Sequence, residues 1–504
     1  MSNTGQVEKV KNEQSHWVIC PKCQGRGKKH KKLRKKLRLQ YQRELDQYEQ
    51  TMRSGAAPVR PKGHLDTCLN CKGAGLVYSA IQPVVDKNYP HLAIIGGGIG
   101  GVALAVACLH RGIPFTLYER DSGFDTRSQG YGLTLQQASK AIEGLGVLSL
   151  QERVISTRHL VHTTEGRVIG EWGVRKLGPL DLQASPKRTN VHIARQSLRL
   201  ALLEQLGGHD AVQWGHQLVD FKECGAGGVD LRFQIEGEGK GTMKSAHADL
   251  VVGADGIRST VRRLLIGEEA SPLCYLGCIV ILGICPLEAI DDTKGIDRSL
   301  LDSATVFQTA NGNERIYIMP YSPSSVMWQL SFPMSENEAK ALSAQGAQAL
   351  KIEACRRCQW HDPIPQILAA TLESQVSGYP VYDRALLDSE LLQKGAQVTL
   401  IGDAAHPMSP FKGQGANQAL LDALALARGI SKGCGPSSQW RQAGLRESVL
   451  TEFEAEMLAR SATKVKGSAE AAQFLHSDVV LHEGDEPRGR CLQRKKIMEP
   501  SLKS

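Results

Sequence analysis

The sequence predicts an α/β fold that is interrupted by a mostly antiparallel sheet and preceded by a small cysteine-bearing module. Residues 81–270 alternate apolar runs with helical patterns, which is typical of β-α-β units and a parallel sheet. Residues 271–380 instead contain strand-like runs such as Arg315–Met319 and Val326–Phe332. Near Gln397 the chain returns to an apolar strand, which a long helix follows. The inserted sheet is therefore expected to separate two parts of one parallel-sheet domain.

These changes in pattern divide the chain into five segments. A region near 155–190 lies within the second segment and is also a candidate for the inserted sheet. The expected segments are a cysteine-bearing module with a basic helix (1–85), the first part of the parallel-sheet domain (90–270), the inserted sheet (271–380), the return of the parallel-sheet domain (381–430), and C-terminal helices with a basic tail (431–504).

Composition and charge are those of a globular protein of several domains, with 504 residues, 41% hydrophobic and 22% charged. The first 80 residues carry 17 Lys/Arg and 6 Asp/Glu, so the rest of the chain carries about −2 of the total charge of +9. Thirteen cysteines are too few for a disulfide scaffold. The apolar run Leu92–Leu109 contains five glycines, which argues against a membrane span. Because the N-terminal stretch is polar, we expect no secretory signal and a cytoplasmic protein.

The segment HLAIIGGGIGGVALAVACLHRGIPFTLYER predicts a strand, a tight turn, a helix and a second strand. Gly96 allows the turn, Gly98 lets a pyrophosphate approach the backbone, and Gly101 lets the helix pack on the strand. The helix N-terminus offers free amide groups and a partial positive charge to phosphates. Glu119 ends the second strand, where a carboxylate accepts hydrogen bonds from a ribose diol. Together these features predict a dinucleotide site, although the glycine pattern alone would be weak evidence.

Two further segments distinguish FAD from NAD, which the glycine turn alone cannot do. In DLVVGADGIRSTVR, Asp255 follows an apolar strand. In IGDAAHPMSPFKGQGANQALLDA, Asp403 ends a strand and Gly413–Asn417 opens a helix. Asp403 is placed to bind the ribityl or pyrophosphate part of FAD, and the helix dipole would stabilise negative charge on a reduced flavin. Helix capping or a turn is the alternative role for both aspartates.

In their order and spacing, these three motifs resemble the class A flavoprotein monooxygenases, the group of para-hydroxybenzoate and salicylate hydroxylases. Within that group the tetracycline-inactivating monooxygenases look most similar. The resemblance covers about residues 90–470 and implies a Rossmann-like FAD-binding domain with an inserted substrate-binding sheet.

The resemblance also implies individual contacts with FAD. Arg195 matches a family arginine that contacts FAD, and Arg127 falls where the tetracycline-inactivating relatives use an arginine for NADPH and flavin contacts. Thr134 replaces the aspartate of those relatives at another flavin contact, which puts this contact in doubt. For the two arginines, an exposed surface position is the alternative. The expected cofactor-binding residues are Gly96, Gly98, Gly101, Glu119, Arg120, Arg127, Thr134, Arg195, Asp255, Asp403, Gly413, Gly415, Ala416 and Asn417.

The implied reaction uses NAD(P)H and O2 to hydroxylate a small aromatic or polycyclic substrate through a flavin C4a-hydroperoxide. The sequence has no second glycine turn of this type after a strand, so NAD(P)H is expected to bind transiently. No residue is assigned an acid–base role; for His406, packing is favoured over a role as catalytic base. Side chains of the inserted sheet are expected either to cover the substrate pocket or to form sheet core, namely Tyr317, Tyr321, Met327 and Trp328.

The N-terminal segment holds two copies of the pattern CxxCxGxG, with cysteines at 20, 23, 68 and 71. The copies resemble the zinc-binding repeats of DnaJ-type cochaperones. Four thiolates form a closed tetrahedral site, so Cys20, Cys23, Cys68 and Cys71 are expected to bind a structural Zn²⁺. Two reduced pairs or a disulfide are the alternatives.

Between the two cysteine pairs, residues 28–53 form a basic, helix-prone insert. Its charge could attract an acidic partner, whether a protein, nucleic acid or membrane surface, and the basic run Lys28–Arg38 makes a nuclear location the alternative to a cytoplasmic one. A solvated helix that braces the zinc module is an equally good interpretation. A second functional hypothesis is therefore an interaction protein whose flavin fold does not hydroxylate. A third is a flavin reductase or oxidase.

Overall fold

The computed structural model describes residues 16–30, 33–50, 58, 61, 65–126, 131–136, 138–147, 150, 152–173, 190–235, 241–290 and 298–489. A five-stranded sheet lies at the centre, and every neighbouring pair of its strands is parallel. Its strands, in spatial order, are β12 (Val212–Gln213), β6 (Phe115–Tyr118), β5 (Leu92–Ile95), β16 (Leu250–Gly253) and β22 (Val398–Leu400).

The central strands come from distant parts of the chain, and the parallel pairing brings their carboxyl ends to one edge. Leu250 pairs with Leu92 and Val251 with Val398, so β16 joins the first strand of the domain to the last. All four residues of β5 and of β16 are buried, as expected for strands covered on both faces. The α/β fold predicted from the sequence is confirmed.

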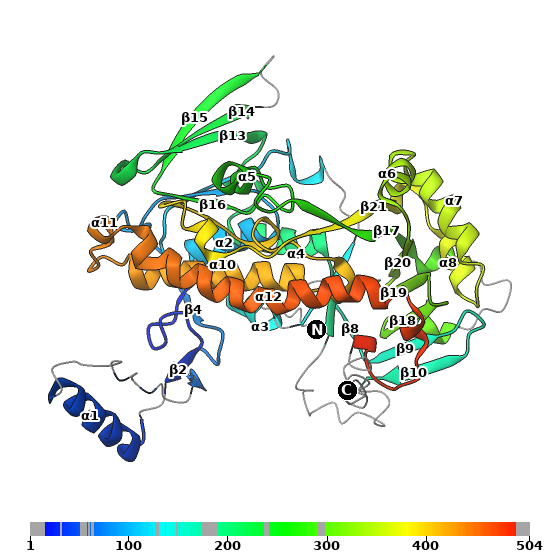
Figure 1. The fold of residues 1–504 in the computed structure, drawn as a ribbon, viewed down its shortest axis with the longest axis horizontal. Coiled ribbons are helices and arrows are strands. Elements are labelled where there is room, and N and C mark those ends of the chain that lie inside the picture. The colour runs from blue at the N-terminus through cyan, green and yellow to red at the C-terminus, as the bar shows by residue number, and fades with distance from the viewer. Residues whose placement is uncertain are drawn as a thin grey trace, which may run out of the picture.

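Helices cover the central sheet and form its core with it. Helix α10 packs against α2, and the long helix α12 runs along α10 and onward to the second sheet (Figure 1). Both α2 and α10 begin at the carboxyl edge of the central sheet. Helix α2 follows β5 in the chain, and α10 follows β22. The helices of this region are α2 (Ile99–Leu109), α3 (Ser139–Glu143), α4 (Arg195–Gln205), α5 (Thr260–Ile266), α9 (Ser389–Leu392), α10 (Gly415–Gly433), α11 (Trp440–Ala443) and α12 (Thr451–Phe474).

A seven-stranded sheet forms the second part of the molecule, and helices α6 (Glu336–Ala344), α7 (Ala347–Arg357) and α8 (Ile364–Ala370) cover its outer face (Figure 1). Its pairs are antiparallel except β9 with β18. The segment at 158–172 belongs to this sheet as β9 and β10. In spatial order the strands are β10 (Val168–Trp172), β9 (Arg158–His162), β18 (Thr305–Ala310), β19 (Arg315–Ser322), β20 (Ser325–Pro333), β17 (Leu273–Pro286) and β21 (Val376–Arg384).

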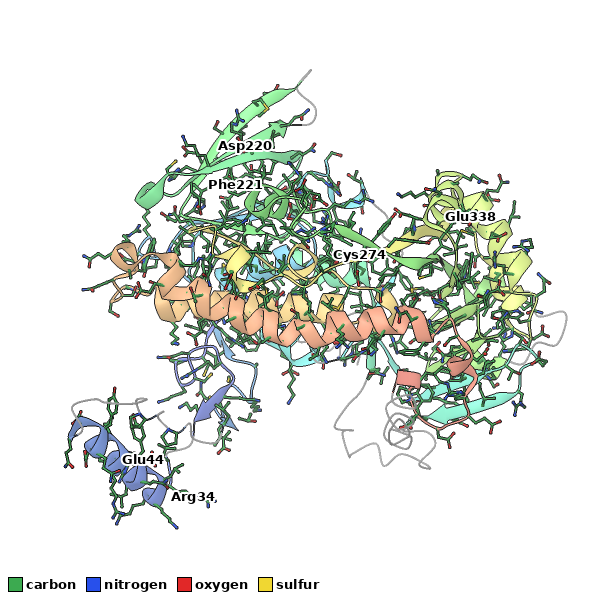
Figure 2. All side chains as sticks on the ribbon, in the orientation of Figure 1. Arg34, Glu44, Asp220, Phe221, Cys274 and Glu338 are labelled. Atoms are coloured by element: carbon green, nitrogen blue, oxygen red, sulfur yellow. The ribbon has the colours of Figure 1, made fainter. Side chains whose placement is uncertain are left out.

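Two three-stranded sheets complete the body. The first consists of β7 (Gly132–Leu135), β11 (Asn190–Ala194) and β8 (Val154–Ser156). It contacts α4 on one side and β19 of the seven-stranded sheet on the other. The second projects from the body and carries Asp220 and Phe221 (Figures 1 and 2). Its strands are β13 (His216–Glu223), β14 (Val229–Ile235) and β15 (Thr242–Ala248).

The N-terminal module consists of two short antiparallel pairs, β1 (His16–Ile19) with β4 (Leu76–Ser79) and β2 (Lys28–His30) with β3 (Leu65–Thr67). Helix α1 (Lys35–Gln50) extends from it and has no buried residue. Figure 2 shows Arg34 and Glu44 at this helix, away from the body of the protein. Residues 31–32 and 51–53 of the basic insert lie outside the described residues, and an acidic partner for the insert stays a prediction.

Within the described part of the chain, no helix is both long enough and apolar enough to cross a membrane.

Candidate functional site

A cavity of about 2250 Å³ opens at the carboxyl edge of the central sheet and reaches the inner face of the seven-stranded sheet. Most of the predicted cofactor-binding residues line it. Gly101 and Asn417 do not, and Arg127 lies outside the described residues. The predicted residues on the cavity wall are Gly96, Gly98, Glu119, Arg120, Thr134, Arg195, Asp255, Asp403, Gly413, Gly415 and Ala416.

The glycine turn has the close packing that a dinucleotide cradle requires. Gly96 has a φ of 110°, and a Cβ atom there would lie 2.5 Å from the carbonyl oxygen of Ala254. A Cβ atom at Gly101 would lie 1.9 Å from the carbonyl oxygen of Gly96, so only glycine lets α2 begin this close to β5. Gly98 faces open space with no atom within 4 Å of a Cβ position. The backbone is therefore free for a phosphate to approach, as FAD requires.

Glu119 lies at the end of β6, directly beside the glycine turn. Its Oε2 accepts a 2.7 Å hydrogen bond from the Gly97 amide, and its Oε1 accepts one from the Asp121 amide. The carboxylate is thus held at the cavity wall, where the ribose of a dinucleotide is expected. Arg120 lies at the rim, with half of its side chain exposed and Asp121 3.9 Å away.

The structure adds Arg199 to the site, which sequence reasoning missed. This buried residue of α4 lines the cavity, and its Nε donates a 2.7 Å hydrogen bond to the Gly97 carbonyl. Its guanidinium also lies 4.9 Å from the ring centre of Phe124 and 5.4 Å from that of Trp214. Arg199 follows Arg195 by one helical turn, and this i, i+4 spacing was the available signal.

Asp403, in the turn after β22, and Arg195, at the start of α4, face the cavity. The Asp403 side chain is open to the cavity, yet it lies deep in the molecule, and this burial raises its pKa above the usual range. Arg195 opposes that shift, while burial lowers the pKa of Arg195 itself. The Arg195 guanidinium also lies 4.9 Å from the ring centre of Tyr131. The cavity wall therefore carries a carboxyl group and a guanidinium group of opposite charge, and burial disfavours the charged form of each.

Asp255 lies on the cavity wall, but its carboxylate accepts hydrogen bonds from the start of α5, the helix that follows it. Its Oδ2 accepts hydrogen bonds from the amides of Thr260 and Val261, and its Oδ1 accepts one from the Ser259 hydroxyl. This is the helix-capping geometry that was the alternative for this residue. A direct contact with FAD stays a prediction.

Asn417 braces the start of α10 rather than facing the cavity. Its Nδ2 donates to the carbonyls of Gly413 and Thr134, and its Oδ1 accepts from the amides of Gln136 and Ala138. The residue is buried and joins the helix N-terminus to β7. The N-terminus of α10 is thereby fixed against the cavity, since Gly413, Gly415 and Ala416 line it.

Thr134 lies on the cavity wall, and its hydroxyl lies 3.0 Å from Nδ1 of the buried His192. His192 Nε2 lies 2.8 Å from the Ser156 hydroxyl, which continues the chain away from the cavity. Burial lowers the pKa of His192 to about 3, so this histidine is neutral at physiological pH. Thr134, which replaces the aspartate of the tetracycline-inactivating relatives, is thus part of a hydrogen-bond chain of uncharged groups.

His406 belongs to a buried network and does not line the cavity. Its Nε2 lies 2.7 Å from Oδ2 of Asp422, which also accepts from the Gly402 amide, while Arg460 donates to Asp422 Oδ1. Burial favours the neutral form of His406, but the Asp422 carboxylate outweighs it and raises the pKa. The contacts support packing behind the Asp403 turn.

The inserted sheet contributes the far wall of the cavity. Tyr317 and Met327 line it, as expected for substrate-pocket residues, whereas Tyr321 and Trp328 do not. Trp328 is fully buried on the opposite face, where its Nε1 donates to Thr371. Neighbouring residues of a strand face opposite sides of the sheet, so Trp328 cannot share the cavity face with Met327. Trp328 is sheet core.

The four predicted zinc ligands gather in the N-terminal module. Their sulfur atoms lie within 4.8 Å of one another, and all four residues are buried, free cysteines. The Sγ atoms of Cys20 and Cys68 are 4.0 Å apart, and those of Cys23 and Cys71 are 3.6 Å apart.

The chain belongs to the family described as the FAD binding domain, because the model of that family matches residues 90–434. It is an FAD-dependent monooxygenase by class, an oxidoreductase with the predicted cofactor FAD. This outcome confirms the resemblance of residues 90–470 to the class A flavoprotein monooxygenases.

Several proteins of known identity are similar to it. The aurachin C monooxygenase/isomerase of Stigmatella aurantiaca is 29% identical over 67% of this chain and 80% of its own length. The 3-amino-4-hydroxybenzoate 2-monooxygenase of Streptomyces cremeus is 25% identical over 83% of this chain and 94% of its own length. A chloroplastic zeaxanthin epoxidase from an Oncidium hybrid is 28% identical over 78% of this chain, which spans 56% of that relative.

Solved structures show the same fold. Klebsiella pneumoniae HpxO, complexed with FAD and uric acid, has a TM-score of 0.61 at 22% identity and covers 82% of this chain and 93% of its own. The tetracycline destructase Tet(51) has a TM-score of 0.52 at 18% identity and covers 82% of this chain and 99% of its own.

Replacing Arg199 by Met is expected to raise the dissociation constant of FAD by about 10- to 100-fold, since a hydrogen bond from a charged group contributes roughly 1.5–3 kcal/mol. The loss of the bond to the Gly97 carbonyl would loosen the glycine turn. Titration of the apoprotein with FAD, followed by flavin fluorescence, measures the effect. Arg232→Met, on the projecting sheet and paired with Asp220, is the control. A change below about twofold would contradict the role given to Arg199.

Asp403→Asn is expected to stabilise the apoprotein and to weaken FAD binding. Burial raises the pKa of Asp403 in the folded state, so the folded protein holds this proton to higher pH than the unfolded chain. The charged aspartate therefore lowers the free energy of unfolding by an amount that grows as pH rises above about 4, the ordinary pKa of an aspartate. Melting temperatures of the two apoproteins between about pH 5 and pH 8 should diverge toward the alkaline end. A pH-independent difference, or the same divergence in the exposed control Asp210→Asn, would refute this assignment.

Proposed function

We propose that this protein hydroxylates a small, largely apolar organic substrate, using NAD(P)H as the electron donor and O2 as the oxidant. The observation that carries the proposal is the single cavity, which joins the glycine turn and the α10 N-terminus to the inner face of the seven-stranded sheet. One space thus offers a flavin site at one end and an apolar wall at the other. Both are needed for oxygen transfer to a bound substrate.

The residues of the chain would hold and shield the reactants. The Gly96–Gly101 turn and the α2 N-terminus would bind the pyrophosphate, and Glu119 the ribose. The α10 N-terminus would face the flavin ring, where its partial positive charge favours the reduced, anionic state. When bound, FAD would supply the electron transfer from NAD(P)H to O2. One oxygen atom would enter the substrate and the other would leave as water. NAD(P)H would supply a hydride, which carries two electrons and one proton, and the solvent would supply a second proton.

The names of the relatives support an aromatic or polycyclic substrate. The Streptomyces relative is named for 3-amino-4-hydroxybenzoate, and the Klebsiella structure holds uric acid. The apolar part of this cavity, with Leu282, Val306, Met319 and Met327, suits a planar ring system.

The purified holoenzyme should oxidise NAD(P)H faster when its substrate is present, and ¹⁸O from ¹⁸O2 should appear in the product. A screen of aromatic and polycyclic compounds, followed by oxygen consumption and mass spectrometry, measures both. Stimulated NAD(P)H oxidation that yields only hydrogen peroxide would indicate a reductase or oxidase instead. A protein that retains no flavin after reconstitution would contradict the proposal altogether.

We also propose that the N-terminal module binds one structural Zn²⁺. A tetrahedral site with Zn–S bonds of about 2.3 Å requires sulfur atoms about 3.8 Å apart, close to the observed spacing. The amides of Gly27 and Gly75 donate to the sulfurs of Cys23 and Cys71 at 3.3 and 3.2 Å. Such amide donors stabilise thiolates over thiols.

The two repeats pack directly into each other around these cysteines. A Cβ atom at Gly27 would lie 2.1 Å from the Gly73 carbonyl oxygen, and one at Gly75 would lie 2.5 Å from the Gly25 carbonyl oxygen. Each repeat therefore needs the glycine of its own motif in order to fit against the other repeat.

Two arginines of the FAD-binding domain support the zinc proposal. Arg428 of α10 donates from Nε to the Gly25 carbonyl, and Arg111 lies directly after α2 against the same glycine. Neither guanidinium has a carboxylate partner among the described residues, and burial together with the nearby Arg428 lowers the pKa of Arg111 to about 10. A zinc ion with four thiolates carries a net charge of −2, which would balance the two positive charges.

The native protein should contain one zinc per chain, and Cys71→Ser should lose the metal and lower the melting temperature of the FAD-binding domain. Arg428→Met should keep the metal but release it to a chelator about tenfold faster, because one balancing charge is lost. Elemental analysis and a colorimetric chelator assay provide the readouts. Cys224→Ser, at an exposed cysteine outside the module, is the control. Full zinc content in Cys71→Ser would rule out this site.

A further inference from the structure

Arg315 is a buried arginine that the flavin site leaves unexplained. It begins β19, lines the cavity and is only 5% exposed. Its Nε donates a 2.7 Å hydrogen bond to Oε1 of Gln308 on the neighbouring strand β18. Among the described residues no carboxylate pairs with it. Burial lowers the pKa of Arg315 to about 10, so the guanidinium still carries its charge at neutral pH.

Other arginines of the described chain with little exposure have partners of one of two kinds. Arg357, Arg384 and Arg460 are paired with carboxylates. The buried Arg111, Arg199 and Arg262 donate to backbone carbonyls instead. An unpaired charge that is removed from water costs several kcal/mol, so proteins rarely retain one without a partner. Arg315 has no carboxylate partner in the described part of the chain, and the cavity that it lines is a route by which a negatively charged ligand can reach it.

The surroundings of Arg315 offer further polar groups on the same wall. Gln329 pairs with Tyr317 across β19 and β20, is 7% exposed, and its Nε2 has no hydrogen-bond partner among the described residues. The Tyr317 ring centre lies 4.9 Å from the Arg315 guanidinium. A buried cation and a buried amide donor without an acceptor therefore share one part of the cavity wall.

The rest of this wall is apolar. Met319 and Met327 lie further along β19 and β20, and Val306 lies on β18. A ligand that fits both features has an apolar body and one compact negative group.

We propose that Arg315, Gln308 and Gln329 form a subsite for the carboxylate of the substrate, which is then an apolar, ring-containing carboxylic acid. This inference rests on the proposed monooxygenase function, because it names the class of substrate that the enzyme would bind in this cavity. The carboxylate would accept hydrogen bonds from the guanidinium and from the Gln329 amide, and its charge would compensate that of Arg315. The ring would pack against the two methionines.

The test compares acids with their neutral amides in binding to the oxidised holoenzyme, without turnover. The probes are 2-naphthoate and 2-naphthamide, 1-naphthoate and 1-naphthamide, and anthranilate and anthranilamide, followed by changes in the flavin absorbance. In the native enzyme at least one acid should bind about tenfold or more tighter than its amide, as expected for a charge-assisted hydrogen bond. Arg315→Met should reduce that preference to less than about threefold and leave the amide affinity unchanged. Arg315→Lys should restore part of it.

Arg158→Met is the matched control, because Arg158 lies on β9 of the same sheet, is paired with Glu171 at 2.8 Å and does not line the cavity. It should keep the acid preference. Flavin spectra and melting temperatures confirm that each variant is folded.

The subsite would be overturned by equal affinity for acid and amide in the native enzyme, by a preference that survives in Arg315→Met, or by no saturable binding of any acid in the panel. Displacement of the acid by inorganic phosphate at equal concentration would also overturn it, because it would show a general anion site. The failure of hydroxylation is a separate result, seen as the absence of ¹⁸O in products, and does not change these binding measurements.

Discussion

The parallel pairing of five short strands is the constraint on which the site depends. Because every strand runs in the same direction, the residues that follow β5, β6, β16 and β22 all emerge at one edge, although they are up to about three hundred positions apart in the chain. Helices α2 and α10 begin at that edge and direct their N-termini at it. A single inversion of strand direction would place the glycine turn and the Asp403 turn at opposite ends of the sheet.

Local sequence was sufficient where one segment determines its own conformation. The glycine turn, Glu119 and the start of α10 at Gly415 could be predicted because the steric and hydrogen-bonding requirements lie within about thirty residues. The direction of each side chain was harder. Met327 and Trp328 are adjacent, and the sequence alone did not show which of them faces the cavity, since both faces of the seven-stranded sheet are covered by apolar groups.

The roles of Arg199 and Arg315 were harder to predict for a different reason. The i, i+4 spacing from Arg195 places Arg199 on the same face of α4, but its contact with the Gly97 carbonyl joins segments about a hundred residues apart. Arg315 is defined by its place on the cavity wall, which its own strand does not determine. Asp255 and Asn417 were also hard to assign, because their residue types suit both a ligand contact and a structural one. In the folded chain most of their hydrogen bonds are made to backbone groups.

The mutual packing of the two cysteine repeats limits how this module can change over time. A side chain at Gly27 would collide with Gly73, and one at Gly75 would collide with Gly25, so each repeat buries a glycine of its motif against the other repeat. Deletion of one copy would expose this packed surface of the remaining copy. The two copies are therefore expected to be inherited and transferred together.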